Sequence, residues 1–213
     1  MEQIFSDIGC VIMASGMGKR FGSNKLLADF AGKPMIQYIL DTTKAVFANR
    51  VVVTRHKEVE EMCLAQQIPV VLHDFPGRND TVRLGLEALG LTGNAENKML
   101  LEHCIFCPSD QPLLTEKTLR ALAESAAGTP EKIWRLSSQG LVGAPVIFPS
   151  WTYPELTKLP EGKGGGVVIR KYPEQVQLLQ IENALELKDA DTRETLQELV
   201  LAYRTIFEKN TEI

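Results

Sequence analysis

Short apolar runs alternate with amphipathic stretches along this chain of 213 residues. The runs are bounded by polar or glycine positions, which is typical of buried strands. They span 8–14, 51–54, 69–73, 100–107, 132–137, 143–148, 176–181 and 185–187. Between them the pattern predicts helices over 57–66, 79–89, 115–127, 151–159 and 192–208. It also predicts one helix that begins at 34 and another that ends at about 172. This alternation predicts one α/β domain over 1–213, with its core at about 8–200 and a mostly parallel sheet flanked by helices.

The segment after the first predicted strand is rich in glycine and cations. Residues 14–25 read Ala-Ser-Gly-Met-Gly-Lys-Arg-Phe-Gly-Ser-Asn-Lys. Glycines let backbone N–H groups approach an anion, because no Cβ blocks the way. Lys19, Arg20 and Lys25 add positive charge. The segment therefore predicts a polyphosphate site, although a glycine turn with solvated cations remains the alternative.

Two better-known phosphate motifs do not fit this segment. Gly18-Lys19 is followed by Arg20, where a P-loop has serine or threonine. Phe21 stands where the third glycine of a dinucleotide fingerprint belongs, and Thr54-Arg55 at the end of the second strand offers no acid for a ribose. These departures disfavour a dinucleotide-binding oxidoreductase.

Carboxylates follow two later strands. Asp110 comes directly after the strand at 100–107, and ligands of open α/β sheets gather at the carboxyl ends of strands. A carboxylate there can hold Mg²⁺ against phosphate oxygens, or it can cap a turn before Pro112. Asp189 and Asp191 follow the predicted strand at 185–187, so either could reach one metal ion, while Asp191 or Thr192 could equally cap the last helix.

A polar loop enters the helix predicted at 79–89. It contains Asn79 and Thr81, and a helix N-terminus with polar side chains can hold a ribose, a base or a phosphate. A solvated, capped helix explains the same residues equally well.

Composition narrows the class of protein. The net charge of −4 argues against a general nucleic-acid binder, and no apolar stretch approaches the ~18 residues of a membrane span. The acidic N-terminus lacks a signal-peptide pattern, so we expect a cytoplasmic protein. Cys104 and Cys107 have C-x-x-C spacing, but residues three apart on a strand face opposite sides. We interpret these and the other two cysteines as buried thiols without a metal or redox role.

The motifs resemble those of one enzyme family. The spacing of Gly16, Arg20, Gly22 and Lys25 is similar to the signature loop of GT-A-like nucleotidyltransferases, whose fold is Rossmann-like. Together with Ser-Asp-Gln-Pro at 109–112, Gly-Ala-Pro-Val-Ile-Phe at 143–148 and Asp-Ala-Asp-Thr at 189–192, the chain resembles the molybdenum cofactor cytidylyltransferases over about 8–200. Ser15 and the Asp-Gln-Pro segment lean towards this branch rather than the related guanylyltransferases.

The resemblance implies transfer of CMP from CTP to the terminal phosphate of molybdopterin-bound molybdenum, with release of pyrophosphate. It implies Mg²⁺ as cofactor, CTP and the molybdopterin cofactor as partners, and a molybdenum hydroxylase as client, with no nucleic acid and no membrane. The implied catalytic residues are Arg20, Lys25 and Asp110, and the implied metal ligands are Asp110 and Asp191. The implied nucleotide-binding residues are Ala14, Ser15, Gly16, Met17, Gly18, Lys19, Arg20, Lys25, Asn79, Thr81 and Asp110, of which Ala14, Ser15, Asn79 and Thr81 would lie near base and ribose.

Three alternatives remain open from the sequence. The chain could be a molybdenum cofactor guanylyltransferase, a nucleotidyltransferase of another sugar or alcohol phosphate, or a pterin cofactor carrier that performs no chemistry. The presence of both Lys25 and Asp110 counts against a pure carrier.

Overall fold

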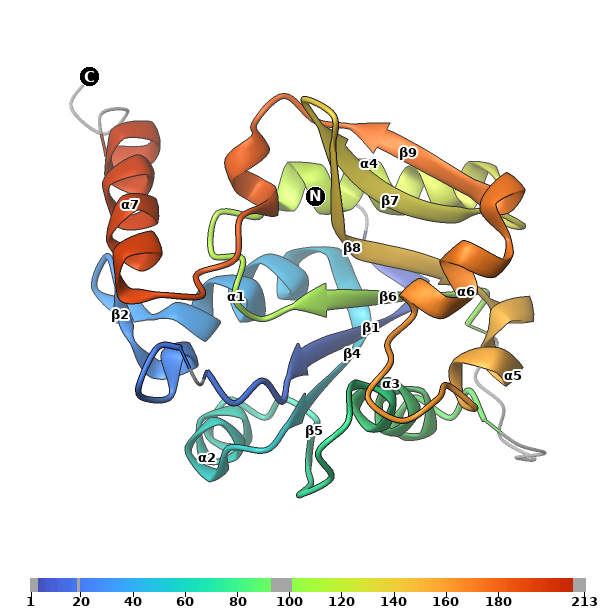
Figure 1. Cartoon of the computed structure of the whole chain (residues 1–213), viewed down its shortest axis with the longest axis horizontal. Helices are drawn as coiled ribbons and strands as arrows, with labels where there is room; N and C mark the ends of the chain where they lie inside the picture. The colour runs from blue at the N-terminus through green and yellow to red at the C-terminus, as the bar shows by residue number, and fades with distance from the viewer. Residues whose placement is uncertain (1–3, 19, 93–100, 209–213) are drawn as a thin grey trace.

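A seven-stranded sheet runs through the molecule in the strand order β5-β4-β1-β6-β8-β7-β9 (Figure 1). The computed structural model describes residues 4–18, 20–92 and 101–208. The strands are β1 (Phe5–Ala14), β4 (Phe47–Thr54), β5 (Val70–Leu72), β6 (His103–Pro108), β7 (Ile133–Ser138), β8 (Leu141–Pro149) and β9 (Val176–Gln180).

The sheet is parallel in its first half and mixed in its second. β5, β4, β1 and β6 pair in parallel, and so do β7 and β9. β8 runs antiparallel to both of its neighbours, β6 and β7. The predicted mostly parallel α/β sheet is therefore confirmed.

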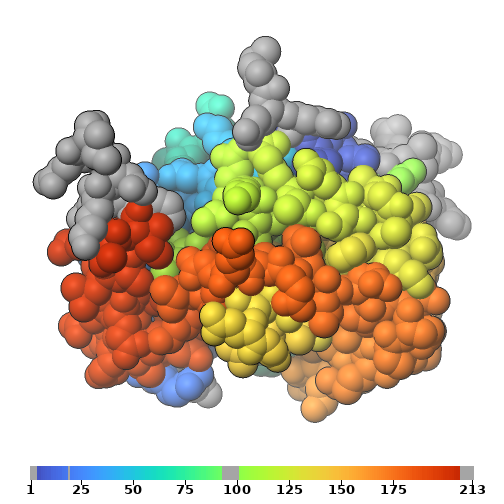
Figure 2. Space-filling view, turned by 90° about the horizontal axis from the view of Figure 1, so that it is seen from above, coloured from blue at the N-terminus to red at the C-terminus, as the bar shows by residue number. Residues whose placement is uncertain are grey.

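Helices cover both faces of the sheet, and each face has its own apolar core. α1 (Met35–Val46), α2 (Lys57–Ala65), α4 (Glu116–Gly128) and α7 (Arg193–Tyr203) contribute buried residues to one core. α3 (Arg78–Ala88), α5 (Tyr153–Leu156) and α6 (Gly166–Lys171) contribute to the other. Seen from above, the chain from α6 to α7, in orange and red, extends across the molecule (Figure 2). Among the described residues, no helix has the length and apolar character needed to cross a bilayer.

The alternation of side chains on the strands separates the two cores. On β1, Ile12 packs in the first core and its neighbour Val11 in the second. Cys107 likewise lies in the first core and Cys104 in the second, which confirms that the C-x-x-C pair faces opposite sides. All four cysteines are free and buried.

The prediction of a strand at 185–187 is wrong. This segment forms the 3-10 turn η4 (Ala184–Leu187), in which the Asn183 side chain accepts a hydrogen bond from the backbone N–H of Leu185. The buried Glu186 carboxylate turns inward and accepts hydrogen bonds from the backbone and hydroxyl of Thr115, at 3.0 and 2.9 Å. A strand would not aim Glu186 at the start of α4.

Three further elements differ from the prediction. The helix expected at 151–159 is shorter and consists of the 3-10 turn η2 (Ser150–Thr152) followed by α5. The helix expected to reach 208 changes after Tyr203 into the π-helical turn η5 (Arg204–Glu208). The sequence did not reveal the small hairpin of β2 (Asp29–Phe30) and β3 (Lys33–Pro34), which turns through Ala31 and Gly32 at positive φ.

Candidate functional site

The glycine loop leaves the carboxyl end of β1 at the centre of the sheet. Ser15, Gly16 and Met17 line a cavity of 920 Å³. Gly18 has φ of +56°, a conformation that favours glycine. The buried side chain of Ala14 packs in the first core, so this predicted nucleotide contact has only its backbone available. Lys19 lies outside the described residues.

Lys25 joins the loop to two distant carboxylates. Its Nζ atom lies 2.5 Å from Oδ2 of Asp110 and 2.9 Å from Oδ1 of Asp191. Lys25 begins the turn η1 (Lys25–Leu27), and the Asn24 side chain caps this turn by accepting from the N–H of Leu26. Its side chain is only 7% exposed, so the ammonium is held in place rather than solvated. The expectation that Asp110 lies on the same sheet edge as the loop is confirmed.

Arg20 joins the same cluster from the solvent side. Its Nη2 atom lies 2.5 Å from Oδ2 of Asp191, although its side chain is 72% exposed. The structure thus brings together Arg20, Lys25, Asp110 and Asp191, the four charged residues that the sequence singled out for catalysis and metal binding.

The cluster shifts the protonation of its members. Burial alone lowers the pKa of Lys25, but the charges of Asp110 and Asp191 and their hydrogen bonds outweigh it, so the pKa lies above the usual value. The hydrogen bond from Lys25 lowers the pKa of Asp191 below its usual value. The directions of both shifts favour the charged forms of Lys25 and Asp191, which hold each other.

Asp189 has different surroundings from Asp191. Its Oδ1 accepts a hydrogen bond from Nε2 of Gln111 at 2.9 Å, and burial followed by the charge of Asp110 raises its pKa. Asp189 lines the cavity and follows the turn η4 rather than a strand. The expectation that Asp189 and Asp191 both follow the end of a strand is therefore wrong. Thr192 caps α7, because its hydroxyl accepts from the N–H of Thr195 at 3.2 Å.

The donor set of the cluster fits a hard divalent cation. Carboxylate oxygens are the ligands that Mg²⁺ and Mn²⁺ prefer. Asp110 and Asp191 converge on one position, which the Lys25 ammonium itself fills as a stand-in cation. Asp189 lies beside Asp110 and feels its charge. The described residues contain no group of three or more such ligands, so Asp110 and Asp191 could hold a metal ion only together with phosphate oxygens, once Lys25 moves to a phosphate.

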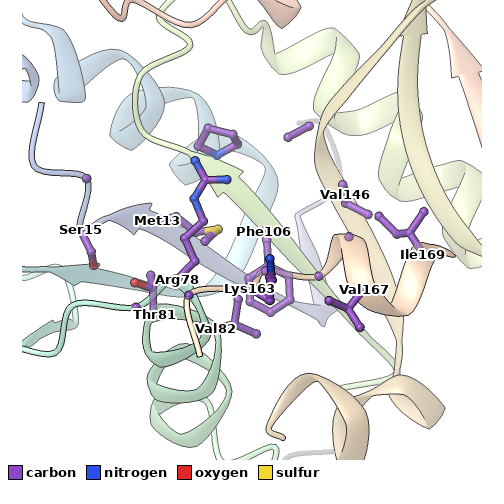
Figure 3. Close-up of a pocket in the computed structure, with 18 of the residues that line it drawn as sticks. Met13, Ser15, Arg78, Thr81, Val82, Phe106, Val146, Lys163, Val167 and Ile169 are labelled. Carbon is purple, nitrogen blue, oxygen red and sulfur yellow. The ribbon is translucent and has the colours of Figure 1, made fainter. Parts of the chain in front are cut away.

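The cavity extends from the glycine loop across the sheet edge to α6. Figure 3 shows Ser15 and Thr81 at one end, Val146, Val167 and Ile169 at the other, and Arg78 and Lys163 between them. We call the first of these the loop end; it is lined by Ser15, Gly16, Met17, Arg55, Pro76, Gly77 and Thr81. Asp110 and Asp189 also line the cavity. It is therefore large enough for a nucleotide and part of a second substrate.

The predicted polar loop before α3 contributes only partly to the cavity. Thr81 lines it, whereas Asn79 is not among the described lining residues and its Oδ1 accepts from the N–H of Gly162 at 2.8 Å. This bond ties α3 to the glycine-rich segment 162–166. Asp80 caps the helix by accepting from the N–H of Gly77 at 3.2 Å.

The sequence did not single out His56, His73 and Arg55, which lie at or beside the loop end. Ser15 Oγ donates to the carbonyl of Val53 at 3.1 Å and lies 2.9 Å from Nε2 of His73, whose pKa burial lowers. His56 Nε2 lies 2.9 Å from the carbonyl of Gly16, which fixes the glycine loop. Arg55 lines the cavity directly. Their positions could have indicated Arg55 and His73 as candidates, because Arg55 directly follows the parallel strand β4 and His73 directly follows β5.

Comparison with solved structures shows the same fold. Rv0371c from Mycobacterium tuberculosis H37Rv aligns with a TM-score of 0.77 and 20% identity, over 92% of this chain and 99% of that chain. The complex of Rv0371c with manganese aligns with a TM-score of 0.72 and 20% identity, over 92% of this chain and 98% of that chain. A nucleotidyl transferase from Methanothermobacter aligns with a TM-score of 0.75 and 21% identity, over 93% of this chain and 98% of that chain.

Curated relatives match over about half of this chain. A probable molybdenum cofactor guanylyltransferase from Aquifex aeolicus is 30% identical over 116 residues, and the bifunctional protein GlmU from Bifidobacterium longum subsp. infantis is 30% identical over 122 residues. Each match covers 54% of this chain, but only 52% and 25%, respectively, of the relative's length. The model of the MobA-like NTP transferase domain matches residues 10–176. Since this match spans most of the chain, the protein belongs to the family of MobA-like NTP transferase domains.

Proposed function

We propose that this protein transfers CMP from CTP to the terminal phosphate of molybdopterin-bound molybdenum and releases pyrophosphate. The observation that carries the proposal is the position of Lys25 between Asp110 and Asp191, beside the glycine loop and the cavity. Family membership supports nucleotidyl transfer in general. The acceptor comes from the sequence resemblance, together with the name of the Aquifex relative.

The residues act mainly by positioning and by charge. Backbone N–H groups of Gly16 and Gly18 would approach the triphosphate. Lys25 and Arg20 would turn from the carboxylates to the phosphates and stabilise the negative charge that develops in the transition state. The acceptor phosphate would attack the α-phosphorus in line, and the bond to pyrophosphate would break.

Asp110 and Asp191 would hold the metal ion when Lys25 moves away. Bound Mg²⁺ would supply charge neutralisation at the leaving pyrophosphate. The manganese complex of Rv0371c concerns a protein of the same fold and supports a divalent cation without deciding which.

The choice of CTP rests on the loop end of the cavity. Ser15 lines it, and its hydroxyl is held by Val53 and His73, so the Ser15 side chain is fixed against the space for a base. A pyrimidine needs less room than a purine. GTP is the second candidate, because the Aquifex relative is named a guanylyltransferase.

The proposal also includes a client and a location. The product would pass to a molybdenum hydroxylase. The reaction would occur in the cytoplasm, where nucleoside triphosphates are available.

Pyrophosphate release with each of the four nucleoside triphosphates, with and without the molybdopterin acceptor, tests the proposal. We expect release that depends on acceptor, on divalent metal and on CTP. Asp110→Asn should lose most turnover while the circular dichroism spectrum stays unchanged. Asp41→Asn is the matched control, because Asp41 forms an exposed ion pair with Lys33 away from the cavity. Acceptor-independent turnover, or an Asp110→Asn variant at wild-type rate under limiting Mg²⁺, would contradict it.

A further inference from the structure

Arg55 is a cation at the loop end of the cavity with unused hydrogen-bonding capacity. It follows β4 directly, and its Nη2 atom donates to the carbonyl of Asp74 at 3.3 Å. Its Nε atom is buried and has no hydrogen-bond partner within the described residues. An arginine side chain carries five N–H donors and no acceptor. Arg55 can therefore donate to a ligand but cannot accept from one.

The backbone carbonyls around Arg55 are already hydrogen bonded. The carbonyl of Val53 accepts from Ser15, and that of Thr54 accepts from the N–H of His73. The carbonyl of Gly16 pairs with His56, and that of Asp74 accepts from Arg55 itself. Each of these four carbonyls therefore already accepts one hydrogen bond, whereas Arg55 retains N–H donors without a partner among the described residues.

Carboxylates do not supply the missing acceptors at the loop end. Among the described residues that line the cavity, the acids are Asp110 and Asp189. Both belong to the other part of the site, where Asp110 pairs with Lys25 and Asp189 accepts from Gln111. The acids of the cavity therefore lie beside Lys25, whereas the loop end carries the cation Arg55, and the cations Arg78 and Lys163 lie farther along the cavity.

This distribution distinguishes between bases. Cytosine and uracil carry a 2-carbonyl oxygen that accepts hydrogen bonds. Guanine can meet an arginine through O6 and N7, but its N1–H and its amino group both need acceptors, whereas cytosine brings only its amino group and uracil only its N3–H. A buried donor left without an acceptor weakens binding strongly. The loop end therefore suits a pyrimidine better than guanine.

We propose that Arg55 is a specificity-determining residue that donates to the 2-carbonyl oxygen of a pyrimidine base. The assignment rests on the proposed function, since that function places the base beside Ser15 and Thr81. It adds a residue that reads the base by charge-assisted hydrogen bonding, in addition to the steric effect of Ser15.

Equilibrium binding of CTP, UTP and GTP, measured by calorimetry with Mg²⁺ and without acceptor, tests this assignment. We expect Arg55→Met to weaken CTP and UTP binding about 10- to 100-fold and GTP binding by less than about threefold. Arg55→Lys should also lose most of the CTP preference, because an ammonium lacks the planar fork of donors. Thermal denaturation of each variant checks that the fold is intact.

Arg83→Met is the matched control. Arg83 lies on α3 near the same end, pairs with Asp80 and Glu87, and is not among the described lining residues. Its loss changes the net charge equally and should leave the ratio of CTP to GTP affinity unchanged.

Three results would overturn the assignment. Equal losses for all three nucleotides in Arg55→Met would make Arg55 a phosphate ligand. If Arg55→Met weakened only GTP binding, or if the wild-type protein bound GTP more tightly than CTP, the site would prefer guanine rather than a pyrimidine. Because binding needs no acceptor, these outcomes are distinct from a failure of CMP transfer to molybdopterin.

Discussion

The Nζ atom of Lys25 lies 2.5 Å from Oδ2 of Asp110, although 85 positions separate the two residues in the sequence. Asp191 completes the arrangement from the other end of the chain. The ammonium therefore occupies the position between the carboxylates that a metal ion would take. Under the proposed function, lysine and metal compete for this position, and a triphosphate would resolve the competition by drawing Lys25 away.

Removing Lys25 should let the free protein bind metal without nucleotide. We expect Lys25→Met to bind Mn²⁺ about tenfold or more tightly than the wild type, because two carboxylates lose their compensating cation. Titration of Mn²⁺ by electron paramagnetic resonance measures this directly. Lys33→Met is the control, since Lys33 forms an exposed ion pair with Asp41. Equal Mn²⁺ affinity of wild type and Lys25→Met would show that Lys25 does not compete with the metal.

The same cluster should make stability depend on acidic pH. Because the hydrogen bond from Lys25 lowers the folded pKa of Asp191, its contribution is present above the ordinary value of 3.8 and is lost as the pH falls through the folded pKa. Asp191→Asn should therefore destabilise the protein near neutral pH, by less than about 1 kcal/mol after solvent screening. The difference should shrink below pH 3.8. Urea denaturation of the wild type and Asp191→Asn near neutral pH and below pH 3.8 measures this difference in the free energy of unfolding. A difference that grows in acid would contradict the stabilising role of the ionised Asp191.

Two substitutions at Ser15 separate its shape from its hydroxyl group. Ser15→Gly should raise GTP use relative to CTP by about 1–3 kcal/mol, because it removes the side chain from the cavity wall. Ser15→Ala should keep most of the CTP preference but lose about 1 kcal/mol of stability, because Val53 and His73 lose their partner. Steady-state kinetics with each nucleotide and urea denaturation give the two readouts. If both variants change base preference equally, the hydroxyl rather than the side-chain volume is responsible.

Close packing of α3 on β1 should be sensitive to one added methyl group. A Cβ at Gly85 would lie 2.5 Å from Cγ1 of the buried Val11, so Gly85→Ala should destabilise the protein by about 1–3 kcal/mol. Gly128→Ala at the end of α4 meets nothing within 4 Å and should be close to neutral. Chemical denaturation compares the two variants. Equal stability would mean that α3 can shift on the sheet, which would loosen Thr81 in the cavity.

The apolar pattern was sufficient for most of the fold because each strand packs on two helical layers. Runs such as 51–54 have few alternatives to a buried strand. The error at 185–187 arose because Leu185 and Leu187 alternate as in a strand, whereas the Asn183 cap and the inward Glu186 impose a turn. That one domain extends over the full 1–213 stays a prediction, since the ends lie outside the described residues.

The candidate site was predictable where a motif follows a strand. Position alone placed Asp110 on the edge that carries the glycine loop. The bond between Lys25 and Asp191 depends on side-chain placement across 166 positions, which local patterns do not contain. Arg55 and His73 belong to no motif, and their positions after β4 and β5 indicate only the sheet edge, whereas their contacts with Asp74 and Ser15 place them at the site.

A competition experiment tests the central claim most directly. Wild-type protein is incubated with equal concentrations of CTP and GTP, Mg²⁺ and molybdopterin-bound molybdenum, and the dinucleotide product is identified by mass spectrometry. We predict a cytosine dinucleotide with one pyrophosphate released per product. A guanine dinucleotide, or nucleotide consumption without a molybdopterin adduct, would contradict the account.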